Sequence, residues 1–121
     1  MKGIEVGKAI KAILEDIDKV YPLVADEGTT FPFIVYRRSS LRPASTKDRY
    51  NYSETATVEI IVASNSYPES INIALQVKDL MEGTRGVYCD INIGEITLIN
   101  AEEDYIEDSF IQKLTFNIEI I

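Results

Sequence analysis

LTFNIEII, residues 114–121, alternates apolar and polar side chains from Leu114 to Ile120. Successive side chains of a β-strand point to opposite faces of a sheet, so this alternation predicts a strand with one buried face and one wet face. The residues expected in the core are Leu114, Phe116, Ile118 and Ile120. The rest of the chain must therefore supply the other strands of a sheet and the elements that cover its apolar face.

The stretch Ser66–Met81 predicts a helix. Ser66 can cap its first turn, Pro68 fits where backbone donors have no helical partner, and Glu69 can close a capping box. Gly83 is placed to end the helix in the left-handed conformation. Apolar residues recur at steps of three and four, and those expected to be buried are Ile73, Ala74, Val77, Leu80 and Met81.

Three further segments have the composition of strands. Phe31–Arg38 is rich in aromatic and β-branched residues and carries Pro32 at a strand's first position, where no ladder donor is needed. Tyr52–Ala63 alternates, and the residues predicted on its core face are Ala56, Val58, Ile60 and Val62. Val87–Asn100 reads as strand material interrupted by a bend, bulge or turn at Gly94.

An amphipathic helix is expected at Ile4–Tyr21, ended by the proline that follows Tyr21. The order of elements is then α-β-β-α-β(-β)-β. It predicts a single α+β domain over residues 1–121, with a mostly antiparallel sheet of four to five strands and two helices packed on one face. Between the first two strands we expect a long mobile hairpin arm at about residues 39–51.

Charge is distributed unevenly along the chain, which has a net charge of -8. Five basic residues cluster around one acid, Asp48; they are Arg37, Arg38, Arg42, Lys47 and Arg49. Five acids gather later, at Glu102, Glu103, Asp104, Glu107 and Asp108. The net charge argues against general affinity for nucleic acid, whereas the asymmetry suits head-to-tail contacts between subunits. The alternative is that both runs are solvated loops.

The sequence offers little to a catalyst. It has no histidine, the commonest general base and metal ligand, and its glycines build no phosphate-binding loop. We therefore expect no enzymatic activity, no cofactor and no metal. Cys89, the single cysteine, lies in an apolar run and is expected to be a buried small hydrophobe. No apolar run approaches the roughly 20 residues that span a bilayer, and no signal-peptide core follows Met1, which indicates a cytoplasmic protein.

Four features together resemble one family of proteins. They are the amphipathic first helix, Pro32-Phe33-Ile34-Val35-Tyr36, the strand Ala56–Ala63 followed by Ser64-Asn65-Ser66-Tyr67 and a helix, and the acidic Glu103-Asp104 before a closing strand. From Ile4 to Ile121 the chain resembles the small tail-completion, or tail-terminator, head-tail joining proteins of long-tailed phages and prophages. The resemblance implies a homo-oligomeric ring, commonly a hexamer, that caps the tail tube and joins it to the head.

The partners implied by this resemblance are other copies of the chain, a tail-tube protein and head-tail connector proteins, with DNA only as passing cargo and no membrane. The protein would lie in the cytoplasm of the bacterial host during assembly and then in the virion tail. The basic arm would contact a neighbouring subunit, the tube protein or DNA, and a protein contact is favoured because the acidic stretch Glu102–Asp108 could receive it. The alternative function is a small ligand- or partner-binding regulatory domain, which a deep apolar pocket with convergent polar groups would favour.

Overall fold

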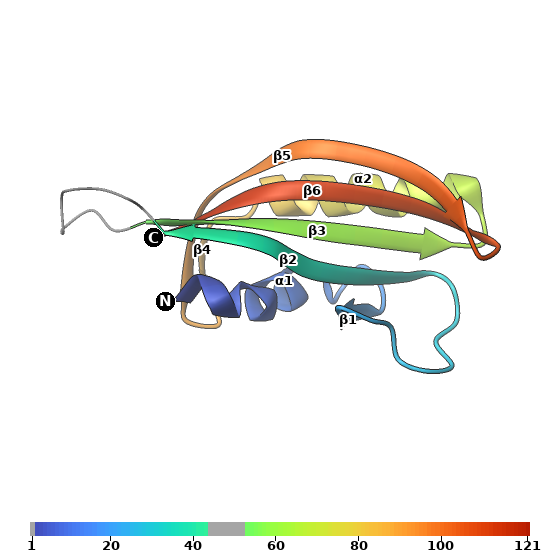
Figure 1. Ribbon diagram of the computed structural model, residues 1–121, viewed down its shortest axis with the longest axis horizontal. Helices are drawn as coiled ribbons and strands as arrows, with labels where there is room; N and C mark the ends of the chain where they lie inside the picture. Colours follow the sequence, from blue (N-terminus) through green and yellow to red (C-terminus); the bar gives the residue numbers. More distant parts are fainter. Residues whose placement is uncertain (1, 44–52) are drawn as a thin grey trace.

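The computed structural model describes residues 2–43 and 53–121. Its elements in chain order are the 3-10 helix η1 (Lys2–Glu5), α1 (Val6–Leu14), β1 (Val20–Pro22), β2 (Phe33–Pro43), β3 (Glu54–Ser64), α2 (Tyr67–Glu82), β4 (Gly86–Tyr88), β5 (Ile91–Ile106) and β6 (Ser109–Ile120). The strands form one mixed sheet in the order β1-β2-β3-β6-β5-β4 (Figure 1). Among the described residues, β1 with β2 is the only parallel pair. The expected α+β class is confirmed, but the described residues form six strands instead of four to five.

The two central strands follow the predicted alternation. In β6 the side chains of Leu114, Phe116, Ile118 and Ile120 are buried, and in β3 those of Ala56, Val58, Ile60 and Val62 are fully buried. The register pairs Val58 with Phe116 and Ile60 with Leu114, so the buried faces of the two strands coincide. Apolar side chains stacked across neighbouring strands are the main source of stability in such a sheet.

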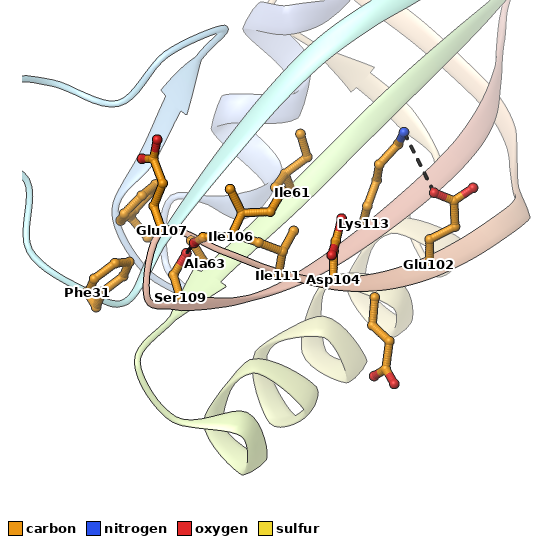
Figure 2. A pocket seen from close by; sticks show the side chains of 12 residues that line it. Phe31, Ile61, Ala63, Glu102, Asp104, Ile106, Glu107, Ser109, Ile111 and Lys113 are labelled. Atoms are coloured by element: carbon orange, nitrogen blue, oxygen red, sulfur yellow. Dashed lines mark hydrogen bonds and ion pairs between the residues drawn. The ribbon is translucent and has the colours of Figure 1, made fainter.

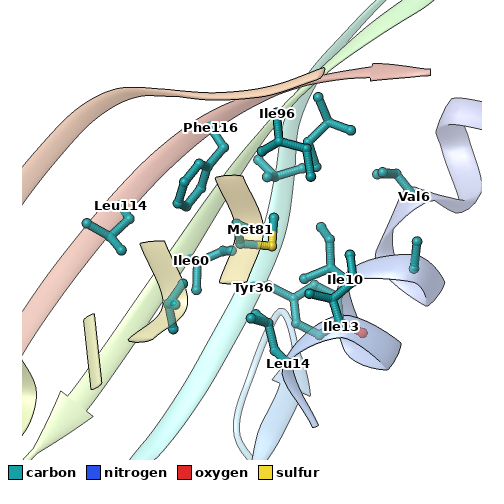
Figure 3. Packing of buried hydrophobic residues seen from close by; sticks show 14 of the residues in the cluster. Val6, Ile10, Ile13, Leu14, Tyr36, Ile60, Met81, Ile96, Leu114 and Phe116 are labelled. Atoms are coloured by element: carbon teal, nitrogen blue, oxygen red, sulfur yellow. The ribbon is translucent and has the colours of Figure 1, made fainter. Parts of the chain in front are cut away.

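Both helices cover the same face of this sheet, as predicted. Ile10 and Leu14 of α1 and Val77 and Met81 of α2 belong to one cluster with the buried side chains of β3 and β6 (Figure 3). Tyr36 of β2 also belongs to this cluster, and burial raises the pKa of its phenol. One core therefore lies between the helices and a single face of the sheet.

The first helix is shorter than predicted. It ends at Leu14, and Val20–Pro22 forms the edge strand β1 instead of a last helical turn. The backbone N–H of Ile34 donates to Lys19 O at 2.8 Å, and the N–H of Leu23 donates to Tyr36 O at 2.9 Å. These bonds to β2 at the two ends of β1 thus replace the helical hydrogen bonds that the apolar spacing had suggested.

The second helix has the predicted place but different ends. Ser66 holds the N-cap position without a side-chain cap bond, and the Ser64 hydroxyl instead donates to Glu69 Oε1 at 2.6 Å. Gly83 has φ -85°, so it does not end the helix in the left-handed conformation. Leu80, expected in the core, is 39% exposed, because the buried stripe passes from Val77 to Met81.

The segment after α2 contains a hairpin that the sequence did not predict. Cys89 and Asp90 connect β4 to β5 as a two-residue turn with φ values of 52° and 65°. Cys89 is exposed, contrary to the expectation of a buried thiol. The irregularity predicted at Gly94 is confirmed, since the β5–β6 register shifts between Ile93 and Ile96.

The charged segments also differ from expectation. β2 continues to Pro43 instead of ending at Arg38, so residues 39–43 of the predicted arm belong to a strand, and residues 40–43 pair with β3. The remainder of the arm, with Lys47 and Arg49, lies outside the described residues. The acidic stretch is not a loop: β5 runs through Ile106, and only Glu107 and Asp108 form the turn to β6.

Candidate functional site

The face of the sheet opposite the helices, here called the open face, carries ordered rows of side chains. One row crosses four strands through Val35, Ile61, Lys113 and Glu102, which are paired in register. The row beside it runs through Phe33, Ala63, Ile111 and Asp104. Apolar residues thus occupy the middle of this face and acids stand on the β5 side.

These rows line a groove of about 470 Å³, here called the open-face groove (Figure 2). Its apolar lining comprises Phe31, Phe33, Ile61, Ala63, Ile106 and Ile111. Its polar lining comprises Glu102, Glu103, Asp104, Glu107, Ser109 and Lys113. The rings of Phe31 and Phe33 stack with centroids 5.5 Å apart and form one wall, while the hairpin end of β5 and β6 forms the other. The groove therefore combines an apolar floor with an acidic rim.

A small ionic cluster lies next to the groove. Glu59 accepts from Arg37 Nε at 2.6 Å and from Lys113 Nζ at 2.8 Å, and Lys113 is also 4.0 Å from Glu102. The hydrogen bond from Lys113 is the main cause that holds the pKa of Glu59 below its ordinary value, and Arg37 adds to it. The same contact raises the pKa of Lys113. Because both cations are partly exposed, the cluster orients these side chains more than it stabilises the fold.

The three described arginines of the predicted site do not act together. Arg37 pairs with Glu59 on the open face. The Arg38 guanidinium donates to Ile4 O at 2.7 Å, which ties η1 to β2. Arg42 lies at the exposed end of β2, in register with Thr55.

The five predicted acids are also divided. Glu102 and Asp104 lie on the open face and line the groove, with Glu107 at its end. The Glu103 carboxylate accepts from Tyr67 Oη of α2 at 2.8 Å and from Gln112 Nε2 at 3.2 Å, and the bond from Tyr67 is the main cause that lowers its pKa. Asp108 belongs to the turn. The structure thus brings Glu102, Asp104 and Glu107 to the groove, and Glu102 lies 4.0 Å from Lys113.

This fold is similar to that of a chain in a solved structure described as "Virion of native gene transfer agent (GTA) particle". The likeness has a TM-score of 0.68, covers 98% of this chain and 89% of that chain, and accompanies 15% sequence identity. It is a likeness of fold. A scan against family models and a search of curated proteins find no match.

Sequence reasoning missed the floor of the groove. Ile61 and Ile111 are apolar, but they alternate with the core residues and were therefore assigned to the solvent face of their strands. Phe31 precedes β2. The run Ile60-Ile61-Val62 could have revealed the groove. Consecutive apolar residues in a strand point to both faces of the sheet, which indicates an apolar environment on each face.

Residues 2–43 and 53–121 contain neither a metal-binding cluster nor a membrane-spanning helix. No group of three or more His, Cys, Asp or Glu residues is arranged to hold a metal ion. In the same ranges, no helix has the length and apolar character needed to cross a bilayer.

Proposed function

We propose that this chain is a structural subunit of a phage-like virion that forms a ring, terminates the tail tube and joins it to the head. The observation that carries the proposal is the likeness to a virion chain, which extends over 98% of this chain. A likeness along nearly the whole length relates the complete arrangement of strands and helices, including the open face, to a protein that functions within an assembly. The resemblance to tail-completion proteins supports the same role.

The described surface fits contacts with protein better than contacts with DNA. The net charge is -8, and the open-face groove has an acidic rim at Glu102, Asp104 and Glu107. Phosphate groups would be repelled there, whereas an apolar or basic protein segment would be attracted. We therefore expect other copies of the chain, a tail-tube protein and head-tail connector proteins as partners, with DNA only as cargo. Assembly would take place in the cytoplasm of a bacterial host and end in the virion tail.

The groove is our candidate contact for the tube or a connector. Phe31 in its wall is 39% exposed, and Ile61 and Ile111 form its floor. Exposed apolar side chains gathered in one depression and rimmed by charge are typical of protein interaction sites. This role requires no reaction, in keeping with the expectation that the protein is not an enzyme.

The test combines particle size with capture on tubes. Multi-angle light scattering over a range of protein and salt concentrations should detect a closed oligomer, and negative-stain imaging should show rings alone or at the ends of tubes polymerised from the tail-tube protein of the same phage or prophage. Ile61→Asp should reduce attachment to the tube ends. Val87→Asp should not, because Val87 is 68% exposed and pairs with Asn92, at the end of β5 opposite the groove residues Glu102 and Asp104. A wild-type protein that stays monomeric and leaves tube ends bare would refute the proposal.

The groove also favours a second candidate, a small ligand- or partner-binding regulatory domain. Its volume of about 470 Å³ is within the range of small-molecule sites, roughly 300–1,000 Å³. Lys113 and Glu102 could orient a polar ligand above the apolar floor. Native mass spectrometry of the protein purified from its own host separates the candidates: a retained small molecule on a monomer supports the regulatory domain, and a ring without added mass supports the tail protein.

A further inference from the structure

We propose that the sheet continues from one copy of the chain to the next, by pairing of an acidic strand edge with a basic strand edge. The acidic edge is residues 96–106 of β5, and the basic edge is residues 37–43 of β2. This inference rests on the proposed ring and names the contact that builds it. The neighbour on each edge is a second copy of this chain.

The acidic edge is long and open. β4 pairs with β5 only from Ile91 to Ile93, and in the part of the chain that the structure describes no strand joins residues 96–106 on the side away from β6. Every residue from 99 to 106 is exposed. A strand edge of this kind presents backbone N–H and C=O groups that pair readily with another chain.

The hairpin at Glu107-Asp108 shows which backbone groups reach the acidic edge. Both turn residues have positive φ, as a type I′ hairpin turn requires. The flanking residues Ile106 and Ser109 therefore direct their backbone N–H and C=O groups toward each other. Backbone groups alternate along a strand, and those of Tyr105, Glu103 and Ala101 therefore point away from β6. The Tyr105 N–H agrees, since it donates to Asp104 Oδ1 at 2.8 Å.

The basic edge lies on the opposite side of the same sheet. β1 pairs with β2 only as far as Tyr36, and among the described residues no strand flanks residues 37–43 on the side away from β3. Arg37, Arg38 and Arg42 are exposed there, although Arg37 also pairs with Glu59 and Arg38 donates to Ile4 O. The basic edge thus carries three cations, and the acidic edge carries Glu102, Glu103 and Asp104.

Charge selects the pairing of unlike edges. Two acidic edges would place like charges opposite each other, and so would two basic edges, which destabilises a ladder. Arg42 and Asp104 both lie on the open face, in register with Thr55 and Ile111, so pairing of unlike edges places them on the same face of the joined sheet. Because every copy carries one edge of each kind, the contact is head-to-tail and repeats until a rotation closes the ring.

Single-edge variants test this arrangement. Ala101→Pro removes a donor from the acidic edge and keeps the ladder with β6, because proline is tolerated where the N–H faces outward. Arg42→Glu places an acid on the basic edge. Each variant should weaken self-association by about tenfold or more, measured by sedimentation velocity. Lys11→Glu on α1 makes the same change in net charge on an exposed residue of neither edge and should assemble like the wild type.

A mixture of the two variants tests the head-to-tail order. Ala101→Pro keeps the basic edge intact, and Arg42→Glu keeps the acidic edge intact. An equimolar mixture should therefore form dimers and stop, at protein concentrations at which each variant alone self-associates least. The double variant Arg42→Glu with Asp104→Lys should regain assembly, because opposite charges face each other again. Far-UV circular dichroism checks that every variant is folded.

The outcomes separate this inference from the proposed function. If the wild type forms rings and both single-edge variants form them equally well, edge pairing is wrong while the ring-forming role stands. A mixture that grows beyond dimers also overturns the head-to-tail contact. If the wild type remains monomeric even with tail tubes, edge pairing and the proposed function both fail.

Discussion

Replacement of Met81 by alanine should destabilise the protein about three times more than replacement of its neighbour Leu80. The two substitutions remove the same number of heavy atoms from adjacent residues of α2, and the helix propensities of methionine and leucine are nearly equal. They differ in burial: Met81 is fully buried and Leu80 is 39% exposed. The pair therefore tests which side of α2 faces the sheet.

The expected magnitudes follow from this burial. At about 0.8 kcal/mol for each buried methylene-sized group, truncation of Met81 removes about 2 to 2.5 kcal/mol of transfer free energy. A cavity in the closed core raises the expected cost to about 3 kcal/mol. Leu80 is already in contact with water and leaves no enclosed void, so its truncation should cost about 1 kcal/mol.

Urea unfolding followed by far-UV circular dichroism gives both free energies of unfolding by linear extrapolation. The measurement needs two protein concentrations, because self-association adds apparent stability that depends on concentration. Equal costs for the two variants, or a larger cost for Leu80→Ala, would show that α2 is rotated relative to the arrangement described here and would refute the reasoning.

Three further predictions concern other elements. The pKa of Glu59 is lowered in the fold, so its stabilising effect is present above the unfolded pKa of the carboxyl and is lost as pH falls through the folded pKa. The urea midpoint should therefore fall more between about pH 5 and pH 3 in the wild type than in Glu59→Gln. Parallel pH profiles of the two proteins would contradict this. The thiol of Cys89 should react with an exposed-thiol reagent at nearly the same rate in folded and unfolded protein, and strong protection of the folded thiol would contradict its position in a turn. Glu107→Asn with Asp108→Gly should raise the free energy of unfolding by about 1 kcal/mol in thermal denaturation, because both turn residues have positive φ, and a loss of stability would argue against this turn.

Sequence alone predicted the strands that have one covered and one uncovered face. Apolar and polar side chains alternate along β3 and β6 because each strand has a paired strand on both edges and only one of its faces meets the helices. The irregularity at Gly94 was also predictable, since glycine in a strand marks a local departure from pairing. Local periodicity is sufficient for such elements.

Elsewhere nonlocal pairing decided the structure. Residues 99–106 of β5 are exposed and so carry no alternation, yet they are strand because the ladder with β6 extends to the turn. The helical spacing through Ile17 continues toward Val20, but pairing with β2 makes Val20–Pro22 a strand. The Cys89-Asp90 turn lacks the glycine that usually reveals a hairpin.

The candidate site was predictable only as two groups of charge. The sequence identified the arginines of β2 and the acids of β5. It could not show that Arg38 donates to Ile4 O or that the Glu103 carboxylate accepts from Tyr67 of α2. Both facts depend on which strand face each side chain occupies. The groove floor depends on the strand order β2-β3-β6, which no local pattern contains.

The position of β6 has a consequence for the synthesis of the protein. β6 is the last strand of the sheet to leave the ribosome, yet it lies between β3 and β5 and is the element that joins β1-β2-β3 to β5-β4 (Figure 1). In a nascent chain that has emerged only through β5, β3 and β5 both have an unpaired edge where β6 belongs, and unpaired strand edges are prone to aggregation. The two halves can therefore join only after β6 has been made, and a chain terminated before β6 would lack the strand that holds the acidic edge and the basic edge in one sheet.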